Sequence, residues 1–540
     1  MIRRIAALLM LLLLAACVSL SPTNTISGGR HLWTQPGHLR LGEPDEPDSL
    51  LEFYAHTAAA DEINNLLFAP VFRLDDRGNF LPELARVVPS YANGGISRDS
   101  KTLVLHFRRG VVWADGAPLT AHDLAFTYRL VMNDRLNVKN RAGWDDIARI
   151  DLPDDYTAVV HLKVPNADVM GLCFSSGGTA YPPLPEHLLA GVSDLERSPY
   201  ARRPVGSGPF ALEKWNHGSS LEFVANPRYW RGRPKLDRIT WKVIPNADTE
   251  YAQLQTHEID VYDGVPENQV DRLHEIIGVT VTKRLLANER YLGINTSRPA
   301  LNDVRVRLAL AEAVNWSRIN NEIYHGFNLR ARSDIIPTSW AAPNVPLYPY
   351  DPGAARRLLD AAGWRIDASG RRTHNGRRLE LVLSSGTNKP LNDAAEVQIQ
   401  SELKALGIGI EIRNYPVNLL FDRRGPIYGG TYDLSLTIDT YGPDPDNEAQ
   451  WNGAFIPPKG VNTSRIDDPV VNETSDAQLR TFDRAKRKAL VQREELRLHE
   501  LVPAVPLYWE NSYAAYNDDL KNYKPAQFIA NLWNSWEYEI

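Results

Sequence analysis

The amino-terminal segment places the first limit on what this chain can fold into. Arg3 and Arg4 precede an apolar run at residues 5–14, and the run ends in Leu14-Ala15-Ala16-Cys17. A helix that spans a bilayer needs roughly 20 apolar residues, so this run is too short to cross one. A charged start, a short apolar centre and small residues at the end are typical of a removable export signal. Residues 1–16 are therefore predicted to be a signal peptide, and the folded part is expected to follow it.

The end of this run resembles the lipobox of bacterial lipoproteins, in which the cysteine is lipidated and holds an otherwise soluble protein on a membrane. The alternative is a plain export signal with an incidental cysteine. Lipidation of Cys17 would leave Cys173 without a partner, so no intramolecular disulfide could form. Cys173 has apolar neighbours, and a core position is predicted for it. Residues 17–38 are predicted to be the lipidated N-terminus and a polar tether, in the periplasm or on the outer face of a bacterial membrane.

The composition fits a globular exported protein. Hydrophobic residues make up 43% of the chain and charged residues 23%, an ordinary balance for a soluble protein. The formal net charge is −6 at pH 7, whereas a nucleic-acid partner calls for a basic surface, so none is expected. At 540 residues the chain exceeds the usual size of one domain, and two or three lobes are expected.

Short strand-like runs alternate with helical ones, and this alternation predicts an α/β fold. The clearest strand candidates are residues 103–107, 158–162, 221–224 and 239–244. One long buried helix is predicted from Asp303, its N-cap, to Ile323. Another helix is predicted to begin at Asp351-Pro352 and to end at Gly363.

No intact catalytic or metal-binding motif is found, so the chain is predicted to be a binding protein without enzymatic activity, metal or cofactor. His274-Glu275 begins like the helix of a zinc protease, but Gly278 stands where the second histidine ligand is required. Gly206-Ser207-Gly208 lacks the outer glycine of a nucleophile elbow and is predicted to be a turn. A glycosidase-type pair of carboxylates stays open as an alternative.

Several stretches together resemble one known family. They include SRDSKTLVLHFRRGV at 97–111, WADGAPLTAHDLAFTY at 113–128, PVGSGPF at 204–210, NPRYWRGRPKLD at 226–237, YLGINT at 291–296 and YGPDPDN at 441–447. Within the second stretch, Asp115-Gly116 predicts a tight turn, and Thr120 with Asp123 predicts a helix cap. The chain resembles the extracellular solute-binding proteins of family 5, which include oligopeptide-, dipeptide- and nickel-binding lipoproteins of ABC importers.

The resemblance implies an α/β, two-lobed periplasmic binding protein of the type II, cluster C-like kind, with an extra domain inserted in lobe I. The implied boundaries place lobe I at residues 39–72, 203–288 and 500–540, the inserted domain at 73–202 and lobe II at 289–499. The lobes are expected to be joined by crossing strands.

The resemblance also implies a function. A substrate-binding lipoprotein of an ABC importer captures a peptide or similar small solute between its lobes by hinge closure, and delivers it to the permease and ATPase subunits. Membrane attachment through the lipid and a monomeric state are expected. The alternatives are a non-transport lipoprotein of the same fold, acting as a sensor or peptide chaperone, a receptor for a non-peptide ligand such as an oligosaccharide, or a secreted hydrolase.

The ligand-binding residues are predicted by position in the resemblance. In peptide-binding relatives an aspartate that holds the free amine of the ligand sits four residues before a proline, and here that position is Tyr441. Asp439, two residues earlier, is the other candidate for the amine, whereas an aromatic side chain at Tyr441 suits stacking on a sugar or another cyclic ligand.

Five further residues are predicted to contact ligand. Tyr54, His56 and Thr57 lie where the first lobe of the family meets ligand, and Asn295 and Trp451 lie near the cleft. For Asn295 a strand-capping role, and for Trp451 a core position, remain as alternatives. His56 has no second metal ligand beside it, so a metal site is not expected there.

Overall fold

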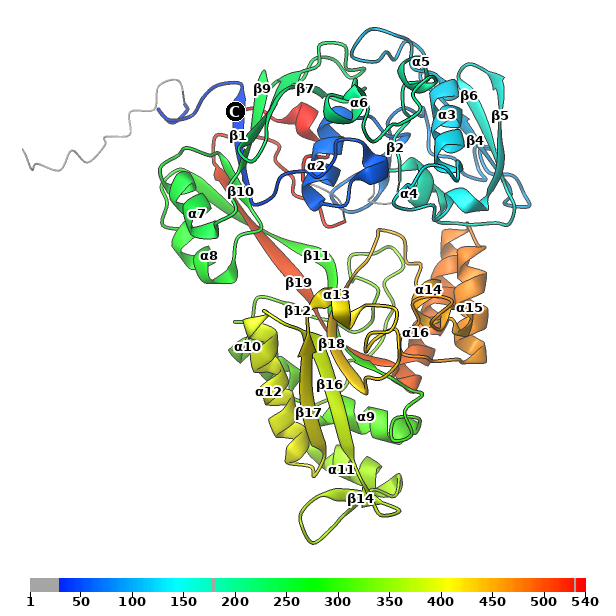
Figure 1. The fold of residues 1–540 in the computed structure, drawn as a ribbon, viewed down its shortest axis with the longest axis vertical. Helices are drawn as coiled ribbons and strands as arrows, with labels where there is room; N and C mark the ends of the chain where they lie inside the picture. Colours follow the sequence, from blue (N-terminus) through cyan, green and yellow to red (C-terminus); the bar gives the residue numbers. More distant parts are fainter. Residues whose placement is uncertain (1–28, 177–179, 529–530) are drawn as a thin grey trace, which may run out of the picture.

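Two long strands, β11 (Val279–Ile294) and β19 (Ala504–Asn517), run side by side through both halves of the molecule (Figure 1). The structure, a computed structural model, describes residues 29–176, 180–528 and 531–540. The predicted signal peptide and Cys17 lie outside the described residues. β11 and β19 pair in antiparallel fashion, and further strands extend the sheet on either side of them.

The resulting sheet has 11 strands in the order β17-β16-β18-β11-β19-β10-β1-β9-β8-β7, with β12 paired to β19. Besides β11 and β19, the strands are β1 (His38–Glu43), β7 (Phe210–Asn216), β8 (Ser220–Ala225), β9 (Arg238–Val243), β10 (Val261–Asp263), β12 (Leu329–Arg330), β16 (Glu380–Gly386), β17 (Gly409–Tyr415) and β18 (Leu434–Thr440). The strands predicted near residues 221 and 239 are β8 and β9.

Two large hydrophobic cores divide the molecule into two lobes. The first core takes residues from 39 to 261 and from 514 to 540, and the second takes residues from 292 to 508. We call the bodies around these cores the first and second lobes. The chain thus leaves the first lobe along β11 and returns to it along β19, as the predicted crossing strands require.

Helices cover both lobes (Figure 1). Those before β11 are α2 (Ala58–Leu67), α3 (Ala121–Val131), α4 (Val169–Phe174), α5 (Glu186–Leu189), α6 (Pro199–Arg202), α7 (Ala247–Gln255) and α8 (Glu267–Leu273). Those after β11 are α9 (Val304–Ala313), α10 (Trp316–Glu322), α11 (Pro352–Ala361), α12 (Pro390–Lys404), α13 (Val417–Leu420), α14 (Glu448–Trp451), α15 (Pro469–Leu479) and α16 (Arg484–Leu501). No helix in the described part of the chain combines the length and the apolar character that crossing a bilayer demands.

The segment predicted as an inserted domain has its own small sheet. In that sheet β6 (Thr157–Leu162) lies between β4 (Thr102–His106) and β5 (Ile147–Asp154), and a separate hairpin joins β2 (Phe72–Leu74) to β3 (Phe80–Pro82). Its buried Trp113, Trp144 and Cys173 belong to the first core, so this segment and the rest of the first lobe share one core. Cys173 is fully buried, as predicted. The residue boundaries of the inserted domain stay a prediction.

Local capping signals act as the sequence predicted. The Thr120 side chain caps α3, and the Asp123 carboxylate accepts from the Thr120 backbone N–H at 2.9 Å, which completes a capping box. Asp115 accepts from the Ala117 N–H at 3.0 Å and Gly116 has a φ of 98°, the left-handed conformation that glycine adopts without strain. Asp351 caps α11 by accepting from the Ala354 N–H at 2.8 Å.

The single helix predicted from Asp303 to Ile323 is wrong. Asp303 does cap α9, but the helix stops at Val314, whose backbone is extended, and α10 begins after Asn315. The Asn315 side chain accepts from the Arg318 N–H at 2.9 Å and so acts as a second N-cap. Because asparagine competes for backbone hydrogen bonds, it favours this interruption over a continuous helix.

The remaining strands form a small three-stranded sheet in the second lobe. Its strands are β13 (Arg365–Ile366), β14 (Arg372–His374) and β15 (Arg377–Arg378).

Candidate functional site

A cavity of about 600 Å³ lies between the two lobes. The first lobe lines it with α2, with the segment from Asp168 to Ser176 and with residues 526–528 and 531. The second lobe lines it with residues 440–446, and Arg284 and Leu286 of the crossing strand β11 complete the wall. A cavity of this size with walls from both lobes is the kind of site that a small ligand occupies.

The two lobes touch at the edges of this cavity. The Ala167 backbone N–H donates to the Leu479 carbonyl at 2.7 Å, next to the first-lobe residue Asp168. On the other side the Thr338 hydroxyl donates to Gln527 Oε1 at 2.9 Å. The structure therefore has the lobes in contact, with the cavity between them.

The N-terminal half of α2 forms part of the first-lobe wall. Ala58, Asp61 and Glu62 line the cavity. Thr57, which was predicted to contact ligand, is the N-cap of this helix: its side chain accepts from the Ala60 N–H and donates to Asp48 at 3.2 Å. Thr57 thus fixes the start of the helix that presents Asp61 and Glu62.

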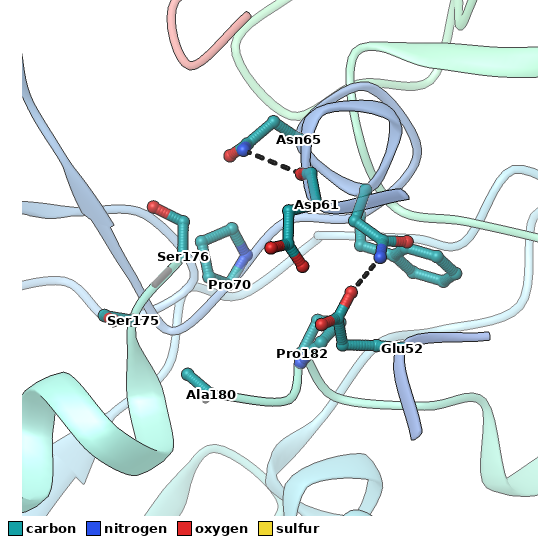
Figure 2. Close-up of a pocket in the computed structure, with 10 residues that line it drawn as sticks. Glu52, Asp61, Asn65, Pro70, Ser175, Ser176, Ala180 and Pro182 are labelled. Carbon is teal, nitrogen blue, oxygen red and sulfur yellow. Dashed lines mark hydrogen bonds between the residues drawn. The ribbon is translucent and has the colours of Figure 1, made fainter. Parts of the chain in front are cut away.

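A small side pocket adjoins the cavity on the first lobe. Figure 2 shows Asp61 of α2 at this pocket, with Ser175 and Ser176 on one side and Glu52 on another. Lys139 Nζ lies 2.5 Å from Glu52 Oε1 and 3.5 Å from Asp61 Oδ1. Lys139 is thus the shared cationic partner of Glu52 and Asp61. Burial raises the pKa of Asp61, and the Lys139 ammonium offsets part of that rise.

The second-lobe wall begins at the end of β18. Tyr441 lines the cavity, and its hydroxyl donates to Glu289 Oε2 at 3.2 Å. Asp444 also lines the cavity and is paired with Arg487, whose Nη1 lies 2.7 Å from Asp444 Oδ2. Asp446 accepts from Gln478 Nε2 at 2.9 Å and from the Glu448 N–H at 3.1 Å.

Asp439 lies in a neighbouring pocket of the second lobe rather than on the wall of the large cavity. That pocket measures about 210 Å³ and is lined also by Tyr291, Gln450 and Trp451. Asp439 Oδ2 accepts from Gln450 Nε2 at 2.8 Å. Burial raises the pKa of Asp439, and the hydrogen bond from Tyr291 offsets part of the rise. The two candidates for the amine position, Asp439 and Tyr441, thus face different spaces.

Trp451 lines the Asp439 pocket from α14. Only 9% of the residue is exposed, and the indole Nε1 donates to Asp334 Oδ2 at 2.6 Å. Trp451 therefore packs within the second lobe and also presents part of its surface to a pocket.

The other predicted site residues have local hydrogen-bonding roles or lie nearer the surface. Asn295 is fully buried, and its Nδ2 donates to the carbonyls of Gly430 at 3.1 Å and Tyr432 at 3.0 Å. His56 is exposed, with its backbone N–H bonded to Asp48 at 2.9 Å. Tyr54 is half-buried against Phe53. The ligand contacts of these residues stay predictions.

None of the five carboxylates at the large cavity was predicted as a site residue: they are Asp61 and Glu62 on the first lobe, Asp168 before α4, and Asp444 and Asp446 on the second lobe. Burial and the nearby Asp263 raise the pKa of Glu62 to about 8. Burial, then Asp444 and Asp446, raise the pKa of Asp168 well above its ordinary value. Burial and Asp444 also raise the pKa of Asp446.

No local motif marks these carboxylates, because they come from three distant segments. Only Asp444 and Asp446 fall in a stretch that carried the family resemblance, YGPDPDN.

Residues 86–457 match the family model of the bacterial extracellular solute-binding proteins, family 5, which covers more than half of the chain. The chain belongs to this family. The resemblance inferred from sequence is thereby confirmed.

Relatives match over most of this family 5 chain. It is similar to the oligopeptide-binding protein AppA of Bacillus subtilis, with 26% identity over 553 residues and 99% of both chains covered. It is also similar to the dipeptide-binding protein of Escherichia coli, with 25% identity over 81% of this chain and 83% of the relative.

Solved structures share the fold. The structure of Bacillus subtilis AppA in complex with a nonapeptide has a TM-score of 0.73 at 24% identity, and covers 93% of this chain and 99% of that one. NikZ of Campylobacter jejuni in complex with Ni(L-His) has a TM-score of 0.75 at 24% identity, and covers 94% of this chain and all of that one. The predicted two-lobed α/β binding-protein fold is confirmed.

Proposed function

We propose that this family 5 protein is the substrate-binding lipoprotein of an ABC importer. It captures a peptide or similar small solute between its lobes and delivers it to a membrane permease. The observation that carries this proposal is the cavity of about 600 Å³ whose walls come from both lobes. A ligand there contacts both lobes only when they are together, so its binding energy favours the closed arrangement.

The crossing strands supply a place for such a movement. β11 and β19 pair irregularly between Leu285 and Glu289, and again between Arg290 and Tyr291. Bulges interrupt the hydrogen-bond ladder and allow a strand to bend. These irregularities lie where the chain passes from the first core to the second, so we place the hinge there.

A binding role without catalysis is part of the proposal, supported by membership in a solute-binding family. We also propose lipid attachment through Cys17, a monomeric state and a location in the periplasm or on the outer face of a bacterial membrane. The transport role is favoured over a sensor or peptide chaperone because a relative from Brucella ovis that is named as a putative ABC transporter peptide-binding protein matches 84% of the chain at 28% identity.

Native mass spectrometry of the full-length protein, purified from its host without denaturation, tests the ligand class. A distribution of peptide masses released on unfolding is the expected result. One discrete non-peptide mass would replace the peptide by another solute, such as an oligosaccharide. Intact mass of the same sample tests lipidation, since a lipidated protein starts at Cys17 and is heavier than the polypeptide from residue 17 to residue 540.

A further inference from the structure

The inter-lobe cavity has more carboxyl side chains than its own cations pair with. Its described lining has five carboxylates and one basic side chain, Arg284; the carboxylates are Asp61, Glu62, Asp168, Asp444 and Asp446. The size of this excess of carboxyl groups depends on how many of the five already have a cationic partner.

The three described cations at or beside the cavity are already paired with carboxylates. Arg284 Nη2 lies 2.7 Å from Asp263 Oδ2, which is outside the lining. Arg487 makes a two-point contact with Asp444. Lys139 is shared by Glu52 and Asp61. None of these cations forms a salt bridge with the remaining described acids of the lining, although Arg284 and Arg487 lie near enough to attract them.

Three acids are left without an ion pair. Glu62 makes no salt bridge with any described residue, and its Oε2 atom is buried without a hydrogen-bond partner. The Asp168 carboxyl group forms neither a hydrogen bond nor a salt bridge within the described ranges. Asp446 accepts only neutral hydrogen bonds, from Gln478 and from a backbone N–H. All three residues are partly buried. A carboxylate that is withdrawn from water without a cation beside it is costly to ionise, so a cavity lined by three of them favours a positive ligand.

The acid excess continues behind the cavity wall. The hydroxyl of Tyr441, which lines the cavity, bonds to Glu289, and Glu289 is 2% exposed with Oε1 unpartnered. Burial, then Asp334 and Asp439, raise the pKa of Glu289 well above its usual value. The field of the second lobe at this wall therefore favours a cation as well.

The unpaired acids stand on opposite lobes. Glu62 and Asp168 belong to the first lobe, and Asp446 belongs to the second. Like charges that approach across a closing cleft repel, and a cation between them reverses the sign of that interaction.

We infer that this cleft selects a ligand with at least two positive charges, a peptide that carries lysine or arginine side chains, and that the ligand favours closure by neutralising carboxylates of both lobes. This inference rests on the proposed function for the binding site. It adds the charge of the ligand and the role of that charge in closure.

Isothermal titration calorimetry of the full-length protein tests the charge preference with three pentapeptides: pentaalanine, and versions with lysine or with glutamate at positions two and four. We expect the lysine peptide to bind at least about 100-fold more tightly than the glutamate peptide at low salt, with the difference shrinking as salt screens it. Equal affinities, or a preference for glutamate, would overturn the inference and leave a peptide-binding role intact.

Spermidine, a cation without a peptide bond, separates the two proposals. If spermidine binds and no pentapeptide does, the charge preference stands while the peptide role fails. If neither spermidine nor any peptide binds, the charge preference fails too.

Variants connect the preference to the named side chains. Glu62→Gln and Asp446→Asn should each reduce the affinity for the lysine peptide about tenfold more than they reduce that for pentaalanine. Glu473→Gln, at a side chain 66% exposed on α15, is the matched control and should change neither. If Glu62→Gln fails to fold, Asp168→Asn replaces it, since that carboxyl has no partner to lose. Unchanged affinity for the lysine peptide in folded variants would overturn the inference.

Discussion

The indole Nε1 of Trp451 donates a hydrogen bond to Asp334 Oδ2 at 2.6 Å, and both residues are more than nine-tenths buried. Asn447 Nδ2 donates to the same oxygen at 3.1 Å. This contact ties α14, which follows the cavity-lining segment, to the interior of the second lobe. The position of the cavity wall therefore depends on a buried, charge-assisted hydrogen bond.

Trp451→Phe should lower the free energy of unfolding by about 1–2 kcal/mol, because Asp334 loses a buried donor while most of the ring packing remains. Chemical denaturation measures the change. In an Asp334→Asn background the same substitution should cost less, with a coupling of about 1 kcal/mol in the double-mutant cycle. Strict additivity would mean that the hydrogen bond contributes nothing to stability.

Asn295→Ala should destabilise the protein by about 2 kcal/mol, because the buried carbonyls of Gly430 and Tyr432 both lose their donor. Ser297→Ala, which removes only the hydroxyl bonded to Asn295 Oδ1, is the milder control. Thermal unfolding and calorimetric titration with the lysine peptide distinguish a structural role of Asn295 from a ligand-binding role. A strand-fixing residue changes stability alone, whereas lost affinity at unchanged stability would make Asn295 a direct ligand contact.

Asp168→Asn should stabilise the ligand-free protein. Its carboxyl group has no hydrogen-bond partner, and burial, then Asp444 and Asp446, oppose its ionisation. Folding must therefore either charge this group beside like charges or keep it protonated, and asparagine removes that cost. The expected gain is about 0.5–1 kcal/mol, seen as a higher melting temperature. Asp155→Asn, at a side chain 70% exposed beside His122, is the control. A lower melting temperature in Asp168→Asn would show that this carboxylate contributes to folding.

The stability of the ligand-free protein should fall as pH rises toward and through about 8. The folded-state pKa of Glu62 is raised to about 8, so between its ordinary value and 8 the folded chain holds a proton that the unfolded chain has released. Burial and Asp263 raise this pKa, Asp61 adds to the rise, and Arg284 and the Asn531 backbone lower it. Other buried acids titrate nearby, so the test is the difference between wild type and Glu62→Gln. The slope of stability against pH should be smaller in Glu62→Gln than in wild type. Identical slopes would contradict the raised pKa of Glu62.

The raised pKa of Glu62 also predicts how the affinity for the lysine peptide depends on pH. A cation stabilises the charged carboxylate, so protons compete with it, and the affinity for the lysine peptide should rise with pH up to about pH 8. One group contributes at most about tenfold per pH unit. Calorimetry at pH 6 to 9 measures the slope, and a pH-independent affinity in wild type would contradict competition by Glu62.

Much of the fold was predictable because its signals are local. The capping box at Thr120 and the cap at Asp351 lie within a few residues of the groups they bond. The predicted strand runs near residues 103, 158, 221 and 239 each coincide with a strand of the structure. The break at Asn315 was missed because an apolar stripe continues across it.

The site was harder to predict. The sequence pointed to Tyr54, His56 and Thr57, whereas the structure places Asp61 and Glu62, further along α2, at the cavity. Which turn of a helix faces a cleft depends on packing between distant segments, and no spacing in the sequence records it. Tyr441 is at the wall as predicted by position, although its ligand contact stays a prediction.

The return of β19 to the first lobe also bears on the order in which the chain acquires structure. Leu520, Tyr523, Leu532, Tyr538 and Ile540 are buried in the first core beside residues that precede them by hundreds of positions. The second core draws on one continuous stretch, residues 292 to 508. During synthesis, which proceeds from the N-terminus, the second lobe therefore has all its core residues while the first still lacks some. Completion of the first lobe, and with it of the ligand cavity, waits for the last residues to emerge.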